Sequence, residues 1–393
     1  MKKIILSVAV AAMALSTTAS ALEDIKVSGQ AKLWYETTNA ADADLFSSKP
    51  NSSGEVVFKL GMTGKQGAVG FGAEVTQGSS MGLEGNVVGA VRTSANNLDG
   101  SGDMYVSKAY FTAPVAPDTI IKMGRQELNT PFAFTEKWNA QQNNFDALVA
   151  INSSVKNLTL IAAFVGQTNT AGGGNVNHKA TESFNQMWGG AYAAGALYKN
   201  DMFSVNGWAY DVKKTVNNQS TMAYWVDAGV KLGPVNVKAI VAMMAPSADA
   251  AESTTGFAAS AGMAVGGVKL FAAGSMVGEG TLPLGNVATN FKKTKLPTAG
   301  VYTDGKYVAM PESTAFKLKA AGKLGSTGLL LQGVMNTNDS VAAGDTLDTM
   351  EIDFIISQKL GAFNMKGILM HRDFDTEGHD AQQHVRVIAS VNF

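Results

Sequence analysis

Hydrophobic and polar residues alternate one by one along most of this chain. A period of two is typical of β-strands that have one apolar and one polar face. The first such segment is a clear case, and the alternation returns up to the C-terminal Phe393. In that first segment one face holds Val27, Ala31, Leu33 and Tyr35, and the other holds Lys26, Ser28, Gln30 and Lys32.

Eighteen segments show this pattern, and the gaps between them alternate between short and long. The short gaps are a few residues at most, such as Gly233-Pro234, whereas the long gaps reach the length of 278–312. All nine prolines fall in the gaps, as expected because proline cannot donate a hydrogen bond within a central strand. The expected strands are 25–36, 54–63, 67–77, 103–113, 118–126, 143–152, 156–166, 187–199, 201–212, 220–232, 235–245, 254–265, 267–277, 313–324, 326–336, 347–360, 362–372 and 382–393.

Regular alternation of short turns and long loops is typical of transmembrane β-barrels, with short turns on the periplasmic side and long loops outside. Lipid offers no hydrogen bonds, so a spanning sheet must close on itself and pair every backbone group. We therefore expect an all-β, antiparallel transmembrane barrel of 18 strands. Sixteen strands is the alternative, if segments 143–152 and 254–265 are loops.

Composition and the N-terminus support export. Only 16% of residues are charged and none is cysteine, which disfavours disulfide scaffolds and zinc fingers. Near-equal numbers of basic and acidic residues give no bulk attraction to nucleic acid. Lys2 and Lys3, an apolar run and Ala19-Ser20-Ala21 have the order of a secretory signal peptide, so residues 1–21 are expected to be cleaved. Residues 22–393 then form a single barrel domain.

The polar faces of the strands carry more basic than acidic side chains. In a barrel this wide, the polar face lines a water-filled lumen, and a basic wall favours anions weakly. A slip of one residue in register would turn individual side chains outward. The expected wall carries Lys26, Lys32, Lys59, Lys108, Lys122, Lys231, Lys238, Lys269, Lys317, Lys319, Lys366, Arg372 and Arg386, with acids at Glu74, Asp227, Glu351 and Asp353.

The third long loop, at about 127–142, mixes charged and aromatic residues. Folded inward, its aromatic residues would pack on the wall while Glu127, Glu136 and Lys137 face the water. Arg125, directly before the loop, would then oppose Glu127 or Glu136 across a constriction to which Lys122 also belongs. The alternative is an outward surface loop without a filtering role, since ordinary loops often carry such residues.

The segment Lys122-Met123-Gly124-Arg125-Gln126-Glu127-Leu128-Asn129-Thr130-Pro131 resembles the GRQ-x-L-x-TP segment of OprD-type porins, which include the major outer membrane porins of Campylobacter and related bacteria. The resemblance implies an eighteen-strand barrel, an inward third loop, passive diffusion of small hydrophilic solutes and often a trimer. It also implies that Arg125 belongs to a basic cluster opposed by acids of the third loop. Terminal Phe393 resembles the signal read by the barrel-assembly machinery.

Other motifs are weaker. The acidic loop Asp373–Gly378 begins like a calcium-binding loop, but its twelfth position is His384 instead of a glutamate, so it is no EF-hand. Loosely bound calcium in this loop stays open as an alternative; no other metal or cofactor is expected. The chain contains no H-E-x-x-H motif, and we expect no enzymatic activity.

The sequence thus predicts a porin in the outer membrane of a Gram-negative bacterium, with ion and solute diffusion through a charged constriction. Its expected partners are the lipid bilayer, lipopolysaccharide, the barrel-assembly machinery and two further copies in a homotrimer. Two rival hypotheses are a non-conducting outer-membrane barrel, such as an adhesin or structural protein, and a soluble secreted β protein.

Overall fold

The computed structural model describes residues 22–40, 44–47, 51–84, 104–170, 180–303, 305, 307–339, 348–375 and 380–393. The predicted signal peptide, 1–21, lies outside these residues. No helix among the described residues has the length and hydropathy to cross a membrane. The one described helical element is a 3₁₀ turn, η2 (Val287–Thr289).

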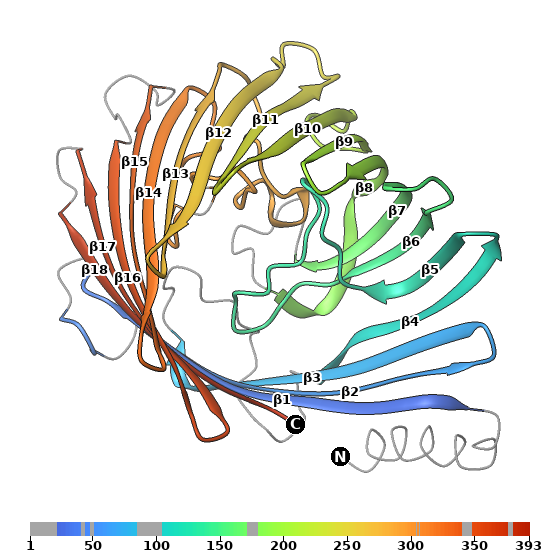
Figure 1. Cartoon of the computed structure of the whole chain (residues 1–393), viewed down its shortest axis with the longest axis horizontal. Coiled ribbons are helices and arrows are strands. Elements are labelled where there is room, and N and C mark those ends of the chain that lie inside the picture. Colours follow the sequence, from blue (N-terminus) through green and yellow to red (C-terminus); the bar gives the residue numbers. More distant parts are fainter. Residues whose placement is uncertain are drawn as a thin grey trace.

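The described strands form one 18-stranded antiparallel sheet (Figure 1). Each strand pairs with its neighbours in sequence, and β1 also pairs with β18, so the sheet closes into a barrel. The strands are β1 (Glu23–Thr38), β2 (Ser52–Gln66), β3 (Val69–Glu84), β4 (Met104–Ala116), β5 (Thr119–Gln126), β6 (Phe145–Asn152), β7 (Leu158–Thr170), β8 (Ala180–Lys199), β9 (Phe203–Val212), β10 (Thr221–Leu232), β11 (Val235–Pro246), β12 (Thr254–Val265), β13 (Val268–Val277), β14 (Ser313–Leu324), β15 (Thr327–Asn338), β16 (Thr349–Leu360), β17 (Phe363–Phe374) and β18 (Gln382–Asn392).

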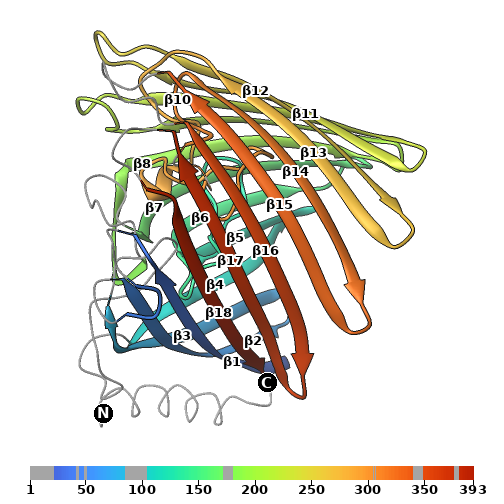
Figure 2. The ribbon, with the colours of Figure 1, turned by 90° about the vertical axis from the view of Figure 1, so that its left-hand side faces the viewer.

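This arrangement confirms the 18-strand prediction. The sixteen-strand alternative is wrong, because segments 143–152 and 254–265 both contain strands, β6 and β12. The short connections gather at one end of the barrel and the long ones at the other, as the β14–β15 and β16–β17 hairpins show in Figure 2. The expected rhythm of turns and loops is therefore present.

A glycine lies at the point where the barrel closes. At the seam, Gly29 of β1 and the C-terminal Phe393 exchange two backbone hydrogen bonds of 2.7 and 3.0 Å. A Cβ on Gly29 would lie 2.2 Å from the Phe393 ring, so only glycine lets that ring lie across β1. The ring also packs against Phe58 of β2, with 5.8 Å between the centroids.

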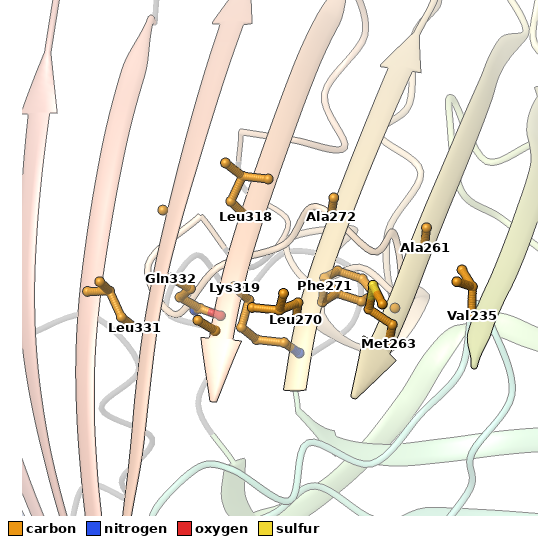
Figure 3. Close-up of a pocket in the computed structure, with 13 residues that line it drawn as sticks. Val235, Ala261, Met263, Leu270, Phe271, Ala272, Leu318, Lys319, Leu331 and Gln332 are labelled. Atoms are coloured by element: carbon orange, nitrogen blue, oxygen red, sulfur yellow. The ribbon is translucent and has the colours of Figure 1, made fainter. Parts of the chain in front are cut away.

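The outer face of the barrel is apolar and exposed. Phe316 and Leu318 on β14 and Met335 on β15 are 62%, 69% and 63% exposed. Between β12 and β15 this face is hollowed over small residues, where Leu318 projects beside Ala272 (Figure 3). An exposed apolar surface of this extent fits a lipid environment rather than water.

The inner face has two different halves. On β6 to β13 it carries a large buried hydrophobic cluster, which includes residues of the connections 127–144 and 278–312. We call these connections the third and the seventh loop. On β14 to β18 and β1 to β5, most inward side chains are polar or charged, such as Lys59, Gln332 and Asp353. The two loops thus bury the apolar half of the interior, and they also contact polar residues of the other half, such as Lys32 and Lys317.

Candidate pore constriction

The third loop begins with a small hairpin inside the barrel. Pro131 sits at the second position of the turn from Thr130 to Ala133, a position that suits its fixed φ. The backbone N–H of Thr130 donates to the carbonyl of Ala133 (3.1 Å), and that of Thr135 donates to Leu128 (2.8 Å). These bonds present Phe132 at the tip of the hairpin.

Phe132 anchors the hairpin to the apolar half of the wall. Its ring meets Tyr210 of β9 and Trp225 of β10 edge-on, at centroid distances of 5.6 and 5.5 Å. Its carbonyl accepts a hydrogen bond from the N–H of Val287 in the seventh loop (2.8 Å). Phe132 is fully buried. The third loop therefore lies inside the barrel and packs on the wall through an aromatic residue.

The other end of the third loop contacts the polar half of the wall. Lys32 of β1 donates from Nζ to the carbonyl oxygens of Asn139 (3.0 Å) and Ala140 (3.3 Å). Gln141 donates from its side-chain amide to the carboxylate of Glu55 on β2. The loop consequently spans the lumen from β9 and β10 to β1 and β2.

Glu127 is the centre of a charge cluster. Its carboxylate forms ion pairs with Lys108 of β4 (2.7 Å) and with Lys137, and accepts a hydrogen bond from Gln142 (2.7 Å). Lys108 also contacts Glu74 of β3 (3.1 Å). Burial raises the pKa of Glu127, but the hydrogen bonds from Lys108 and Lys137 outweigh it and lower the pKa to about 2. Glu127 is thus a fixed negative charge between two lysines.

Arg125 does not oppose Glu127 or Glu136, so the expectation of that pairing is wrong. Its guanidinium instead forms a two-pronged pair with Asp146 of β6, at 2.8 and 3.0 Å. It also donates to the carbonyl of Val106 on β4 (2.8 Å) and lies 3.3 Å from the ring centre of Phe184. Through these contacts Arg125, next to the last residue of β5, links β4 to β6 in the wall.

Glu136 does not face the water either. It is 1% exposed, and its carboxylate accepts hydrogen bonds from Asn139 (2.8 Å) and from Asn286 of the seventh loop (3.2 Å). Its role is to join the two loops. The neighbouring Lys137 and Trp138 do remain open, with exposed fractions of 64% for the lysine side chain and 47% for Trp138. The edge of the third loop that faces the lumen therefore carries an amine and an indole.

The predicted wall residues lie on the inward parity of their strands, but they differ in exposure. Lys26 is exposed, and Lys122 lies over the ring of Tyr110 at 3.7 Å. Lys319 lies over Phe271, 4.6 Å from the ring centre. Lys59 is 8% exposed, which leaves little of it open to the lumen.

Three other wall residues are corrected by the structure, because they are covered. Arg372, 1% exposed, lies over the ring of Tyr302 in the seventh loop, 3.9 Å from the ring centre. Lys317, 8% exposed, donates to the carbonyl of Ala299 in the seventh loop. Arg386, 4% exposed, forms an ion pair of 2.7 Å with Glu36 of β1, which is itself fully buried. These three side chains hold the seventh loop and the barrel seam instead of lining an open channel.

The seventh loop is the main feature that the sequence analysis missed. Glu351 of β16 accepts hydrogen bonds from the backbone N–H groups of Tyr302 (2.8 Å) and Thr303 (2.6 Å). On its other side the loop buries Leu284, Val287 and Phe291 in the hydrophobic cluster. Its length and these apolar residues were available signals, since loops this long are uncommon without a function.

The seventh loop also brings a lysine to the third loop. Lys295 donates from Nζ to the side-chain oxygen of Asn129 (2.5 Å) and lies 5.0 Å from the ring centre of Phe134. Burial lowers the pKa of Lys295 to about 8, and the nearby positive charge of Lys238 adds to the effect, while Asp227 opposes it. The charge of Lys295 therefore changes within a pH range in which channel currents can be recorded.

The calcium alternative is not tested by the structure. Residues 376–379 of the acidic loop lie outside the described residues. Within the described ranges, no group of three or more His, Cys, Asp or Glu side chains could hold a metal ion.

The fold is shared with solved outer-membrane porins. The structure of Pseudomonas aeruginosa OccK3 (OpdO) superposes with a TM-score of 0.74 at 12% identity, covering 96% of this chain and 97% of that one. Acinetobacter baumannii OccAB1 gives 0.73 at 14% identity, with coverage of 94% and 97%. Pseudomonas aeruginosa OpdK, solved with vanillate, gives 0.70 at 11%, with coverage of 94% and 98%.

These similar structures belong to the OprD/Occ family of porins, which are not enzymes. The segment 122–131 resembles a segment of the same OprD-type porins, whereas the likeness to the Campylobacter porins stays an expectation. No family model matches the sequence. No curated protein matches it either. At identities this low, the likeness establishes the fold, and function is argued from the residues.

Proposed function

We propose that this protein is an outer-membrane porin through which small hydrophilic solutes and ions diffuse passively, with a preference for anions. The observation that carries the proposal is the closed 18-stranded barrel with exposed apolar residues outside and lysines on its inner face. A barrel of this size cannot be filled by its own wall side chains. The proposed work is steric and electrostatic, and involves no covalent chemistry.

The preference for anions follows from how the inward acids are used. Glu36 is paired with Arg386, Glu74 with Lys108, and Glu351 accepts from the seventh loop. Several inward lysines, such as Lys323, Lys359 and Lys366, have no such acidic partner among the described residues. Rings of basic residues favour anions in pores. The vanillate bound to OpdK is a small aromatic carboxylate, which agrees in sign with this proposal.

Recording from the purified, folded protein in planar bilayers tests the proposal. We expect stepwise conductance and, in a salt gradient, a reversal potential displaced toward that of the anion. A folded preparation that never conducts would contradict the proposal. It would favour the non-conducting barrel. The hydrogen bonds between the third loop and Asn286 agree with that alternative, because they join the two inward loops across the interior.

The remaining partner predictions belong to this proposal. The exposed apolar face supports contact with lipid and lipopolysaccharide in the outer membrane. Trimer formation is tested by cross-linking in native membranes. The assembly role of Phe393, which is 60% exposed at the seam, is tested by the yield of folded protein from the variant Phe393→Ala.

A further inference from the structure

A second, separate feature lies between the third loop and the short turns of β14–β15 and β16–β17. It is a cavity of about 450 Å³, with Lys137 and Trp138 of the third loop on its border. The other basic residues of its lining are Lys32, Lys323, Lys359 and Lys366, and no carboxylate belongs to the lining. The feature therefore lies on the short-turn side of the constriction.

Strand register explains why the lysines meet around a hollow. One row of paired residues runs from Lys359 through Asn364 and Ser390 to Lys32. A second row runs from Lys323 through Gly328 and Ser357 to Lys366. In both rows long basic side chains flank short ones across four strands. With neighbouring strands about 4.8 Å apart, each pair of lysines is separated by roughly 14 Å at the backbone.

The charge of this cavity is not balanced by the protein. Lys137 forms an ion pair with Glu127. In the part of the chain that the structure describes, the other four lysines have no carboxylate within 4.0 Å. Lys32 donates only to loop carbonyls. Four ammonium groups with like charge around one hollow repel each other, and the repulsion is relieved when a ligand with several negative charges lies between them.

We propose that this cavity is a binding site for compact polyvalent oxyanions, of which di- and triphosphates are the type. A monovalent anion would leave most of the positive charge unbalanced. The lining contains no arginine, so an anion there is held by lysines as point charges, as in known phosphate sites. Ser357, Ser390 and Asn364 offer hydroxyl and amide donors between the lysines. The inference rests on the proposed porin function only for access through the lumen.

Titration calorimetry with inorganic tripolyphosphate on the full-length protein in detergent tests the site. The variant carries Lys323→Gln, Lys359→Gln and Lys366→Gln together. The matched control carries Lys199→Gln, Lys231→Gln and Lys269→Gln, which removes the same charge from inward positions of β8, β10 and β13 outside this lining. We expect at least a tenfold weaker affinity in the variant and less than a twofold change in the control.

Equal weakening in both triple variants would overturn a localised site in favour of a general charge effect. No measurable binding of tripolyphosphate to the wild type would overturn it as well. Bilayer recordings separate this inference from the porin proposal. A silent barrel that binds tripolyphosphate with the expected pattern refutes the porin and keeps the site, whereas a conducting barrel that binds none refutes the site alone.

Discussion

The two halves of the barrel interior differ in what their inward side chains require. On β6 to β13 they are largely apolar, and residues such as Trp225 and Ile240 would face water if the third and seventh loops did not cover them. On β14 to β18 and β1 to β5 they are largely polar, and some lysines, such as Lys323 and Lys359, are exposed, whereas Lys317 is covered by the seventh loop. Burial of apolar surface therefore determines where the loops lie, and the exposed lysines of the polar half determine which ions the lumen favours.

Phe132 is the strongest point at which to break this arrangement. Replacing it with alanine removes a fully buried ring from Tyr210 and Trp225, a loss of about 3–5 kcal/mol for a large-to-small core change. We expect a lower midpoint of thermal unfolding in detergent and a higher single-channel conductance, because the third loop is released. Phe316→Ala on the outer face, where the ring is 62% exposed, is the control. Unchanged conductance in a folded F132A barrel would mean that the loop does not narrow the passage.

The charge of Glu127 is expected to give the next largest effect. In Glu127→Gln, Lys108 and Lys137 lose an ionised partner, so the reversal potential should move further toward that of the anion. Asp118→Asn, in the β4–β5 turn, removes one charge far from the third loop and is expected to change little. An equal shift in both variants would show that net charge, and not the cluster, sets selectivity.

The low pKa of Glu127 gives this prediction a pH range. Because the pKa in the folded protein is about 2, below the usual value of 4.5, ionised Glu127 stabilises the fold above pH 4.5, and this stabilisation is lost as the pH falls toward 2. The difference in reversal potential between wild type and Glu127→Gln should accordingly be constant from pH 7 to 5. Its disappearance already at pH 5 would contradict the ion pairing described above.

Lys295 of the seventh loop should add a smaller, alkaline effect. Its pKa of about 8 means that it is mostly charged at pH 7 and mostly neutral at pH 9. The anion preference of the wild type should therefore decrease over this range, with a midpoint near pH 8. Lys295→Met should already show the weaker preference at pH 7 and should show a smaller step. A step of the same size in Lys295→Met would assign the titration to another group.

The strands could be predicted from the sequence because each has an exposed apolar face on the outside and a different face toward the interior. This contrast is strong enough to give period-two patterns for segments as short as β6. The inward position of the third loop was also within reach, since Phe132 and Phe134 are out of place on a solvated surface. The seventh loop was not predicted to turn inward, because its apolar residues follow no regular period.

The partners of single charged residues were beyond reach of the sequence. Gly124 has a φ of +115°, and a Cβ there would lie 2.2 Å from the carbonyl oxygen of Ala109. The strand is thus distorted directly before Arg125, where alternation cannot say how the guanidinium lies. Glu136 shows a second difficulty, since its partner Asn286 is 150 residues away in a loop.

Arg125 gives the smallest expected effect on selectivity. Its variants distinguish a structural residue of the barrel wall from a residue in the ion path. Its side chain and that of Asp146 are 24% and 29% exposed, and the pair is held at 2.8 Å between β5 and β6. For a pair so accessible to solvent, a double-mutant cycle with Arg125→Gln and Asp146→Asn should give a coupling energy of about 0.5–1 kcal/mol in unfolding. The double variant with Arg125→Gln and Asp146→Asn should hardly move the reversal potential, because it removes two opposite charges of the wall together. A shift as large as that of Glu127→Gln would instead place Arg125 in the ion path and overturn the division between a structural wall and a selective passage.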